Sequence, residues 1–257
     1  MIDKLFNLKG KTAIVTGGGN GIGKSSCEML SAFGANVVVS DLKEEDAQKV
    51  ADQINSNGGR AVAVACNVTK DEDLQNVVNV AKDTFGSIEV LVNNAGGGGG
   101  GRENPFKIDV DRFKWVFELN LFSAWRLSQL CAPEMKKAGY GSIINITSMG
   151  SINKSPNMSA YASSKAAMNH MSANLAHDYG PYGIRVNCVG PGATKTAALA
   201  SVLTPEIEEK MLAGTPIKRL GEVEDISGAI LYFAAPVSEW VSGQVLFVNG
   251  GGVQTLD

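Results

Sequence analysis

The sequence has no long hydrophobic run and no excess of positive charge. No apolar stretch of the 257-residue chain approaches the roughly 18 residues typical of a membrane span. The N-terminal segment MIDKLFNLKGK lacks the apolar core and the small-residue cleavage site of a secretory signal. The net charge is −3, and lysines and arginines are spread along the chain instead of forming a basic patch. We therefore expect a cytoplasmic protein without a nucleic-acid or membrane partner.

Cysteine and histidine are also scarce. The four cysteines are Cys27, Cys66, Cys131 and Cys188. They are far apart and form no CxxC pair, which disfavours a metal knuckle and a disulfide framework. The two histidines, His170 and His177, are seven residues apart, which is a poor spacing for metal ligands. We expect reduced thiols and no metal site.

Short β-branched runs alternate with longer amphipathic stretches along the whole chain. The seven strand candidates are nearly continuously apolar, as expected for parallel strands covered on both faces. They span residues 12–17, 36–41, 60–68, 88–96, 141–148, 184–192 and 244–251. Helical spacing occurs over 22–33, 43–56, 71–85, 111–138, 159–179 and 222–235. This unbroken βαβ rhythm predicts one α/β domain over 1–257, a doubly wound Rossmann fold with a seven-stranded parallel sheet and helices on both faces.

A glycine-rich turn follows the first strand candidate. Gly17, Gly21 and Gly23 have the spacing GxxxGxG, directly between a strand and a helix. Glycine at these positions allows a tight turn and lets a pyrophosphate approach the backbone, while the N–H groups of the following helix face the phosphates. The pattern predicts a dinucleotide-binding site.

Asp41 ends the second strand candidate and indicates which dinucleotide is bound. A carboxylate there can accept hydrogen bonds from both ribose hydroxyls of NAD, and it repels the 2′-phosphate of NADP. Neither Asn20 nor Leu42 supplies a cation for that phosphate, although Lys24 and Lys43 are nearby. We favour NAD over NADP, and the alternative is that Asp41 only caps the next helix.

Six consecutive glycines, residues 96–101, follow the fourth strand candidate. Such a run can be a domain linker, or it can let a ligand approach the backbone. The strand and helix rhythm continues on both sides, so a linker would have to split the sheet. The run also lies at the carboxyl end of a strand, where open α/β sheets bind ligands. We favour a binding site.

Tyr161 and Lys165 are four residues apart in a helical segment and therefore share one face. Ser148 ends the fifth strand candidate and can approach that face. Hydride transfer from an alcohol needs a base for the hydroxyl proton. A nearby ammonium lowers the pKa of a tyrosine, normally about 10, by about 1 to 3 units. We predict that Tyr161 is the base, that Lys165 lowers its pKa, and that Ser148 holds the substrate oxygen; separately, each could be a surface or capping residue.

Together these residues resemble the short-chain dehydrogenase/reductase family. The matching motifs are TGGGNGIG at 16–23, NNAG at 93–96, YASSK at 161–165 and PGATKT at 191–196. The resemblance spans essentially the whole chain. It implies a fourth catalytic residue, Asn120, because a local distortion of the family's long helix at this position holds a water in a proton relay with Lys165.

The resemblance also implies the binding residues. The nucleotide-binding set is Gly17, Asn20, Gly21, Ile22, Gly23, Asp41, Leu42, Asn67, Val68, Asn94, Ala95, Gly96, Tyr161, Lys165, Pro191, Gly192, Thr194 and Thr196, with Asn93 and Val189 beside it. The substrate set is Gly98, Gly99, Ser148 and Tyr161. Asn67 stands where the family often has Asp, at a position expected to accept a hydrogen bond from the adenine amino group.

Long matches outside the motifs, such as 127–137 and 201–212, resemble bacterial 7α-hydroxysteroid dehydrogenases within this family. They imply a bile acid or related rigid alcohol or ketone as substrate, and a part in lipid metabolism. The glycine run would form an open floor for such a substrate, and residues 195–219 would form a lid over it. The apolar side of this lid, with Leu199, Val202, Leu203 and Met211, would meet either the substrate or the domain core. Family members are usually homotetramers, in which the two long helices, 111–138 and 159–179, and the C-terminal segment 240–252 meet partner copies.

Two other functions stay open. One is a 3-oxoacyl-carrier-protein reductase or another small-alcohol dehydrogenase of the same fold. A carrier-protein reductase would favour NADPH and need a basic docking patch, and Asp41 argues against NADPH. The other is a non-catalytic nucleotide sensor, which would not need Ser148, Tyr161 and Lys165 together.

Overall fold

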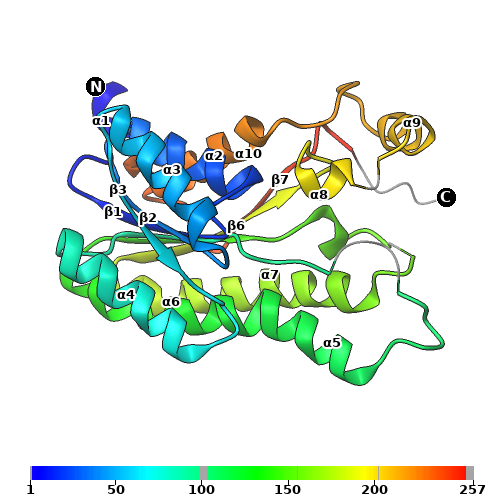
Figure 1. Cartoon of the computed structure of the whole chain (residues 1–257), viewed down its shortest axis with the longest axis horizontal. Helices are drawn as coiled ribbons and strands as arrows, with labels where there is room; N and C mark the ends of the chain where they lie inside the picture. The colour runs from blue at the N-terminus through cyan, green and yellow to red at the C-terminus, as the bar shows by residue number, and fades with distance from the viewer. Residues whose placement is uncertain (1, 99–102, 155, 202, 253–257) are drawn as a thin grey trace.

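The structure, a computed structural model, describes residues 2–98, 103–154, 156–201 and 203–252. Its centre is one parallel sheet of seven strands in the order β3-β2-β1-β4-β5-β6-β7 (Figure 1). The strands are β1 (Thr12–Thr16), β2 (Asn36–Asp41), β3 (Arg60–Ala65), β4 (Val90–Asn93), β5 (Gly141–Ile146), β6 (Ile184–Pro191) and β7 (Val245–Val248). This arrangement confirms the predicted doubly wound α/β fold.

Helices cover both faces of the sheet (Figure 1). One face carries α2 (Gly21–Ala32), α3 (Glu44–Ser56) and α10 (Val223–Ala234). The opposite face carries α4 (Asp71–Phe85), α6 (Ser123–Ala138) and α7 (Ser159–Tyr179). The remaining α-helices are α1 (Ile2–Leu5), α5 (Val110–Phe117), α8 (Ala197–Ala200) and α9 (Pro205–Ala213). Short 3₁₀ turns are η2 (Met149–Ser151), η3 (Gly180–Tyr182) and η4 (Pro236–Ser238).

The apolar strands supply both cores because successive side chains point to opposite faces. In β1, Ala13 and Val15 belong to the buried cluster under α2 and α3, whereas Ile14 belongs to the cluster under α4 and α6. In β5, Ile144 and Ile143 divide in the same way. A strand that feeds two cores has to be apolar at every position, which explains the continuous runs in the sequence.

The predicted helix over 111–138 is interrupted. A π-helical turn, η1 (Glu118–Phe122), separates α5 from α6. Asn120, at the centre of the turn, is fully buried and forms hydrogen bonds outside its own helix, with Gly97 and Ser164. The family resemblance implies a distortion at this place, whereas hydrophobic spacing alone predicts one regular helix.

Two residues separate the glycine run from the end of β4, a central strand that pairs with both β1 and β5. The sheet is therefore continuous across this region, and the interpretation of 96–101 as a domain linker is wrong. Gly96 to Gly98 lie at the carboxyl edge of the sheet, together with the ends of β1, β2, β5 and β6. Among the residues described, no helix is long and apolar enough to cross a membrane.

Candidate active site

The loop between β1 and α2 favours glycine by its backbone conformation or by the lack of space for a side chain. Gly17 and Gly21 have positive φ values of 63° and 54°, which favour glycine. A Cβ on Gly23 would lie 2.0 Å from the carbonyl oxygen of Gly17. Asn20 precedes α2 without capping it through its side chain, so the first N–H groups of the helix are free for another acceptor. The loop fits the pyrophosphate of a dinucleotide.

Asp41 faces this loop from the end of β2. Its Oδ2 accepts a hydrogen bond of 2.9 Å from the N–H of Gly19, and its Oδ1 accepts one of 3.1 Å from the N–H of Lys43, the residue that precedes α3. The carboxylate thus orders both the glycine loop and the start of the helix. Leu42 beside it is 69% exposed and brings no positive charge.

Thr16, which sequence reasoning missed, joins the two glycine segments. Its Oγ1 accepts hydrogen bonds of 3.1 and 3.0 Å from the N–H groups of Asn94 and Ala95. The side-chain amide of Asn94 donates in return to the carbonyl oxygens of Thr16 and Gly17. The buried threonine thereby fixes the end of β4 against the end of β1.

Ser148, Tyr161 and Lys165 come together at the same edge. Ser148 follows β5, and its Oγ accepts a hydrogen bond of 3.0 Å from the N–H of Gly150. Tyr161 lies in the first turn of α7, and Lys165 lies one turn further along. The Lys165 ammonium donates to the carbonyl oxygen of Ile146 at 2.7 Å and lies 5.9 Å from the centre of the Tyr161 ring.

Burial dominates the electrostatics of this group. Burial raises the pKa of Tyr161, and a hydrogen bond with Ser148 lowers this pKa only in part. Lys165 is 3% exposed, and burial lowers its pKa to about 8. Burial is thus the largest cause of the Tyr161 shift, and the prediction that Lys165 lowers the pKa of Tyr161 stays a prediction.

Asn120 and Lys165 lie together beneath Gly96. The Asn120 amide accepts a hydrogen bond from the N–H of Gly97 at 2.9 Å and donates to the Gly97 carbonyl oxygen at 3.0 Å. A Cβ on Gly96 would lie 2.9 Å from Asn120 Oδ1 and 3.2 Å from Lys165 Nζ. Glycine at 96 is therefore needed for the backbone to pass over both side chains.

Two asparagines of the predicted site are held by hydrogen bonds within the protein. Asn93 is buried, and its amide donates to Ala124, Ser128 and Asn145, so its side chain stabilises the core and does not line the nucleotide side. Asn67 Oδ1 accepts two hydrogen bonds from Thr69, which fills the capacity of a carbonyl oxygen. The expected contact of Asn67 with adenine competes with this turn. Ile22 and Val68 are half-buried and buried, respectively.

The segment after β6 approaches the glycine loop. Thr194 donates to the carbonyl oxygen of Gly192 at 3.1 Å, and Thr196 caps α8 through the N–H of Leu199. The methyl carbon of Thr196 would lie 3.5 Å from a Cβ on Gly21. Pro191 to Thr196 thus border the predicted nucleotide site, and Val189 is buried behind it.

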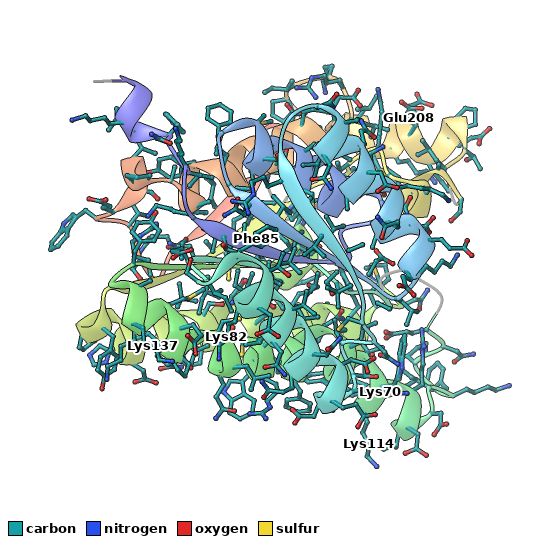
Figure 2. The ribbon with its side chains drawn as sticks, turned by 60° about the vertical axis from the view of Figure 1, so that its left-hand side comes forward. Lys70, Lys82, Phe85, Lys114, Lys137 and Glu208 are labelled. Carbon is teal, nitrogen blue, oxygen red and sulfur yellow. The ribbon has the colours of Figure 1, made fainter. Side chains whose placement is uncertain are left out.

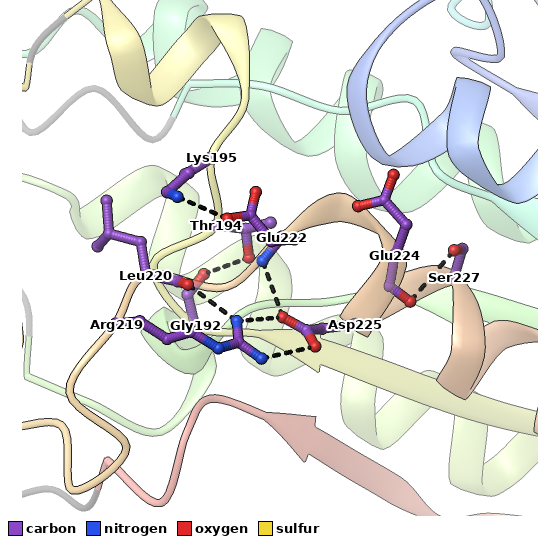
Figure 3. Close-up of polar contacts among 9 residues, drawn as sticks. All are labelled: Gly192, Thr194, Lys195, Arg219, Leu220, Glu222, Glu224, Asp225 and Ser227. Carbon is purple, nitrogen blue, oxygen red and sulfur yellow. Dashed lines mark hydrogen bonds and ion pairs between the residues drawn. The ribbon is translucent and has the colours of Figure 1, made fainter.

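Two ion pairs join the two ends of the predicted lid, residues 195–219, to the start of α10 (Figure 3). Lys195 pairs with Glu222, and Arg219 forms two hydrogen bonds of 2.6 and 2.9 Å with Asp225. Backbone hydrogen bonds also join residues 193 and 195 to Gly221. Between these anchors, α9 has no buried residue, so this helix packs only lightly on the domain. Val202 lies outside the described residues.

Of the two substrate glycines, Gly98 is described and Gly99 lies outside the described residues. Gly98 has a φ of 93°, and a Cβ there would lie 3.0 Å from Val116 Cγ2. A larger residue at 98 would strain the loop whatever the substrate is. Substitution of Gly98 is therefore a poor test of substrate shape.

Glu103 caps the helix that carries Tyr161. Its carboxylate accepts hydrogen bonds from the Ser159 hydroxyl at 2.7 Å and from the N–H of Ala160 at 3.2 and 3.1 Å. Met158, which precedes the helix, makes no side-chain cap. Sequence reasoning missed this residue because it is 56 positions from Ser159, whereas sequence patterns for helix caps are local.

The thiols and histidines form no site within the described part of the chain. All four cysteines are buried and unpaired. Burial raises the pKa of the Cys66 and Cys188 thiols to about 11, which keeps them protonated and unreactive. No group of three or more His, Cys, Asp or Glu residues in the described ranges could hold a metal ion.

The glycine cradle, the acidic strand end and the Ser–Tyr–Lys group on this sheet define a dehydrogenase class. A sequence model of the family described as enoyl-(acyl carrier protein) reductase matches residues 17–252. The chain belongs to the short-chain dehydrogenase/reductase family and is an oxidoreductase, as the motifs predicted.

Individual relatives are similar over their whole length. The chain is 50% identical to the 7α-hydroxysteroid dehydrogenase of Escherichia coli, over 98% of both chains. It is 36% identical to the 7α-hydroxysteroid dehydrogenase of Clostridium sardiniense, over 95% of this chain and 94% of the relative. A solved structure of 7α-hydroxysteroid dehydrogenase complexed with NADH and 7-oxo glycochenodeoxycholic acid has a TM-score of 0.95 and 49% identity, covering 100% of this chain and 99% of the other.

The buried ammonium predicts a pH-dependent stability. Burial lowers the pKa of Lys165 from 10.5 to about 8, so between these values the unfolded chain binds a proton that the folded chain has lost. Stability then rises with pH in this window. A Lys165→Met variant lacks this gain, so urea unfolding should show the wild type gaining up to about 3 kcal/mol relative to it between pH 7.5 and 10. Lys70, which is exposed (Figure 2), is changed to Met as the control. The wild type should gain no stability relative to Lys70→Met as the pH rises. If Lys165→Met and Lys70→Met show the same change of stability with pH, the account is contradicted.

Glu103 predicts the local stability of α7. Glu103→Ala removes the cap, which is worth about 1 kcal/mol, so the peptide over 159–165 should exchange amide hydrogens about fivefold faster. Glu103→Gln keeps an acceptor and should restore part of the protection. Exposed Glu118, changed to Ala, is the control, and hydrogen exchange measured by mass spectrometry reports all three variants. Unchanged exchange at 159–165 in Glu103→Ala would show that the cap is unimportant.

Proposed function

We propose that this chain is an NAD-dependent 7α-hydroxysteroid dehydrogenase that interconverts the 7α-hydroxyl and 7-oxo groups of bile acids. The observation that carries the proposal is 50% identity with a 7α-hydroxysteroid dehydrogenase across 98% of both chains. The cofactor and the substrate class follow from the similar structure, which holds NADH and a 7-oxo bile acid. Ser148, Tyr161 and Lys165 at the sheet edge supply the required polar groups.

Each catalytic side chain has a distinct task in this proposal. The Ser148 hydroxyl, held by the Gly150 N–H, binds the substrate oxygen next to Tyr161. Tyr161 Oη accepts the hydroxyl proton during oxidation and donates it during reduction. Lys165 stabilises the negative charge that develops on this oxygen, and Asn120 fixes the backbone above Lys165. Bound NAD supplies the hydride acceptor and, when oxidised, a positive charge that lowers the raised pKa of Tyr161.

The nucleotide-binding residues are proposed on the same basis. The loop with Gly17, Gly21 and Gly23 fits the pyrophosphate, and Asp41 accepts hydrogen bonds from the ribose. Ala95 and Gly96 border the nicotinamide side together with Thr194 and Thr196. Residues 195–219 close over the substrate, and the ion pairs at their base act as the fixed end of this lid.

We also propose a homotetramer. Phe122 and Trp125, on the long helix, are about half exposed, and Trp240 is completely exposed. Large apolar side chains that reach solvent commonly mark protein interfaces. Phe122 and Trp125 lie in the predicted helix interface, and Trp240 lies in the predicted C-terminal interface. A cytoplasmic location and a part in lipid metabolism remain proposals from the sequence.

One alternative has a specific observation in its favour. The matching family model is described as enoyl-(acyl carrier protein) reductase, which keeps a carrier-protein substrate open. The lack of a cation at Asn20 and Leu42 argues against NADPH, which we expect such a reductase to prefer. The identity with hydroxysteroid dehydrogenases over whole chains outweighs the description of a broad family model.

Absorbance at 340 nm tests the proposed substrate directly. With NAD, cholate should give NADH, whereas the 7-epimer and the 7-deoxy analogue should give none, because only cholate has a hydroxyl in the 7α position. Tyr161→Phe should lower kcat by at least about a hundredfold. Turnover of a simple alcohol but of no bile acid would remove the steroid assignment and leave the Ser–Tyr–Lys site intact.

Asp41 should select the cofactor. Asp41→Asn keeps the size of the side chain and removes its charge, so the ratio of kcat/KM for NAD to that for NADP should fall by about tenfold or more. Exposed Asp52, changed to Asn, is the control for the loss of one negative charge. A ratio that stays constant in Asp41→Asn would restrict Asp41 to ordering the loop through Gly19.

A further inference from the structure

A cavity of about 590 Å³ lies beside the proposed substrate site, and the proposed chemistry does not use its charged groups. It is lined by Gly98, Glu103, Asn104, Lys107, Ile108, Asp109 and Arg112. We call it the α5 groove, because it lies between the start of α5 and the described end of the glycine run. The groove contains two acidic side chains, Glu103 and Asp109, and two basic side chains, Lys107 and Arg112. The acids and the bases differ in their hydrogen-bond and ion-pair partners.

The α5 groove adjoins the catalytic elements at two points. Gly98, on its wall, follows Gly97, whose backbone is held by Asn120. Glu103, also on its wall, forms a hydrogen bond with the N–H of Ala160, the residue before Tyr161. The groove therefore lies next to the backbone segments that border the proposed catalytic group.

The two acids of the groove are occupied by local hydrogen bonds. Glu103 accepts from Ser159 and Ala160 at the start of α7, where the helix dipole further offsets its charge. Asp109 caps α5 by accepting from the N–H of Asp111 at 3.2 Å. Both carboxylates are therefore committed to helix termini.

The two bases have no such partner. Lys107 and Arg112 are exposed, and neither forms an ion pair with a residue in the described ranges. The Arg112 guanidinium lies over the Trp115 ring at 4.3 Å, which limits its conformations. The groove thus presents two cations and an apolar side chain, Ile108, next to the site.

We infer that the α5 groove binds the anionic tail of an amphipathic carboxylate substrate, with Lys107 and Arg112 as the cations that select it. The inference rests on the proposed function, since a bile acid bears its carboxylate on a flexible side chain away from the rigid ring that reacts. When a ring hydroxyl is fixed at Tyr161, that tail needs a binding place outside the catalytic group. Two cations without ion-pair partners among the described residues, in a groove that shares Gly98 with the proposed floor, meet this need and would disfavour uncharged sterols.

The test compares cholate with its uncharged methyl ester, both below their micellar concentrations, by NADH formation at 340 nm. The selectivity, defined as kcat/KM for cholate divided by kcat/KM for the ester, should fall about five- to tenfold in the double variant Lys107→Met, Arg112→Met. It should fall further in Lys107→Glu, Arg112→Met, because that variant repels the carboxylate. In the wild type it should also decrease as salt rises, since exposed charges are screened.

Lys114→Met is the matched control. Lys114 lies on α5, as Arg112 does, and pairs with Asp111. Its side chain projects away from the ribbon (Figure 2), so the selectivity of Lys114→Met should stay at the wild-type value. Turnover of the ester by each variant reports that the variant is folded. If the wild type oxidises both compounds and the double variant keeps the full selectivity, the inference is wrong and the proposed function stands. If the wild type oxidises neither compound, the proposed function fails and the inference falls with it.

Discussion

The burial of the Lys165 ammonium is the constraint on which the rest of the site depends. A buried charge is destabilising unless it is hydrogen-bonded, and here the Ile146 carbonyl provides the bond at 2.7 Å. The penalty remains visible in a pKa lowered to about 8. Gly96 passes directly over the ammonium, where a Cβ would lie 3.2 Å from Nζ. The same backbone thus seals the charge from water and forms the floor on which a ligand would lie.

The neighbouring elements hold this backbone in place from two sides. Asn120, in a π-helical turn of the long helix, forms two hydrogen bonds with Gly97. Thr16, at the end of β1, receives the N–H groups of Asn94 and Ala95. These bonds connect the glycine cradle, the glycine run and the catalytic helix. A proposed nucleotide and a proposed substrate would therefore meet on one surface, and α9, in the proposed lid, has no buried residue.

Local patterns in the sequence predicted the fold and most of the candidate site. Continuous apolar runs marked strands that feed two cores, the GxxxGxG spacing marked the cradle, and four-residue spacing placed Tyr161 with Lys165. Features that depend on distant residues were not predictable. The cap on α7 comes from Glu103, Asn93 turns into the core to meet Asn145, and burial raises the pKa of Tyr161 although a lysine lies nearby. Each is decided by packing between segments that are remote in the chain.

The central claim is that Tyr161 abstracts the proton while hydride leaves carbon 7 of a bile acid. The most direct measurement is a single turnover of cholate carrying deuterium at carbon 7, with the nicotinamide product analysed by mass spectrometry. The account predicts that the reduced nicotinamide contains the deuterium, that the rate shows a primary isotope effect, and that Tyr161→Phe binds NAD but transfers almost no deuterium. Reduced nicotinamide without deuterium, or transfer at the wild-type rate by Tyr161→Phe, would contradict it.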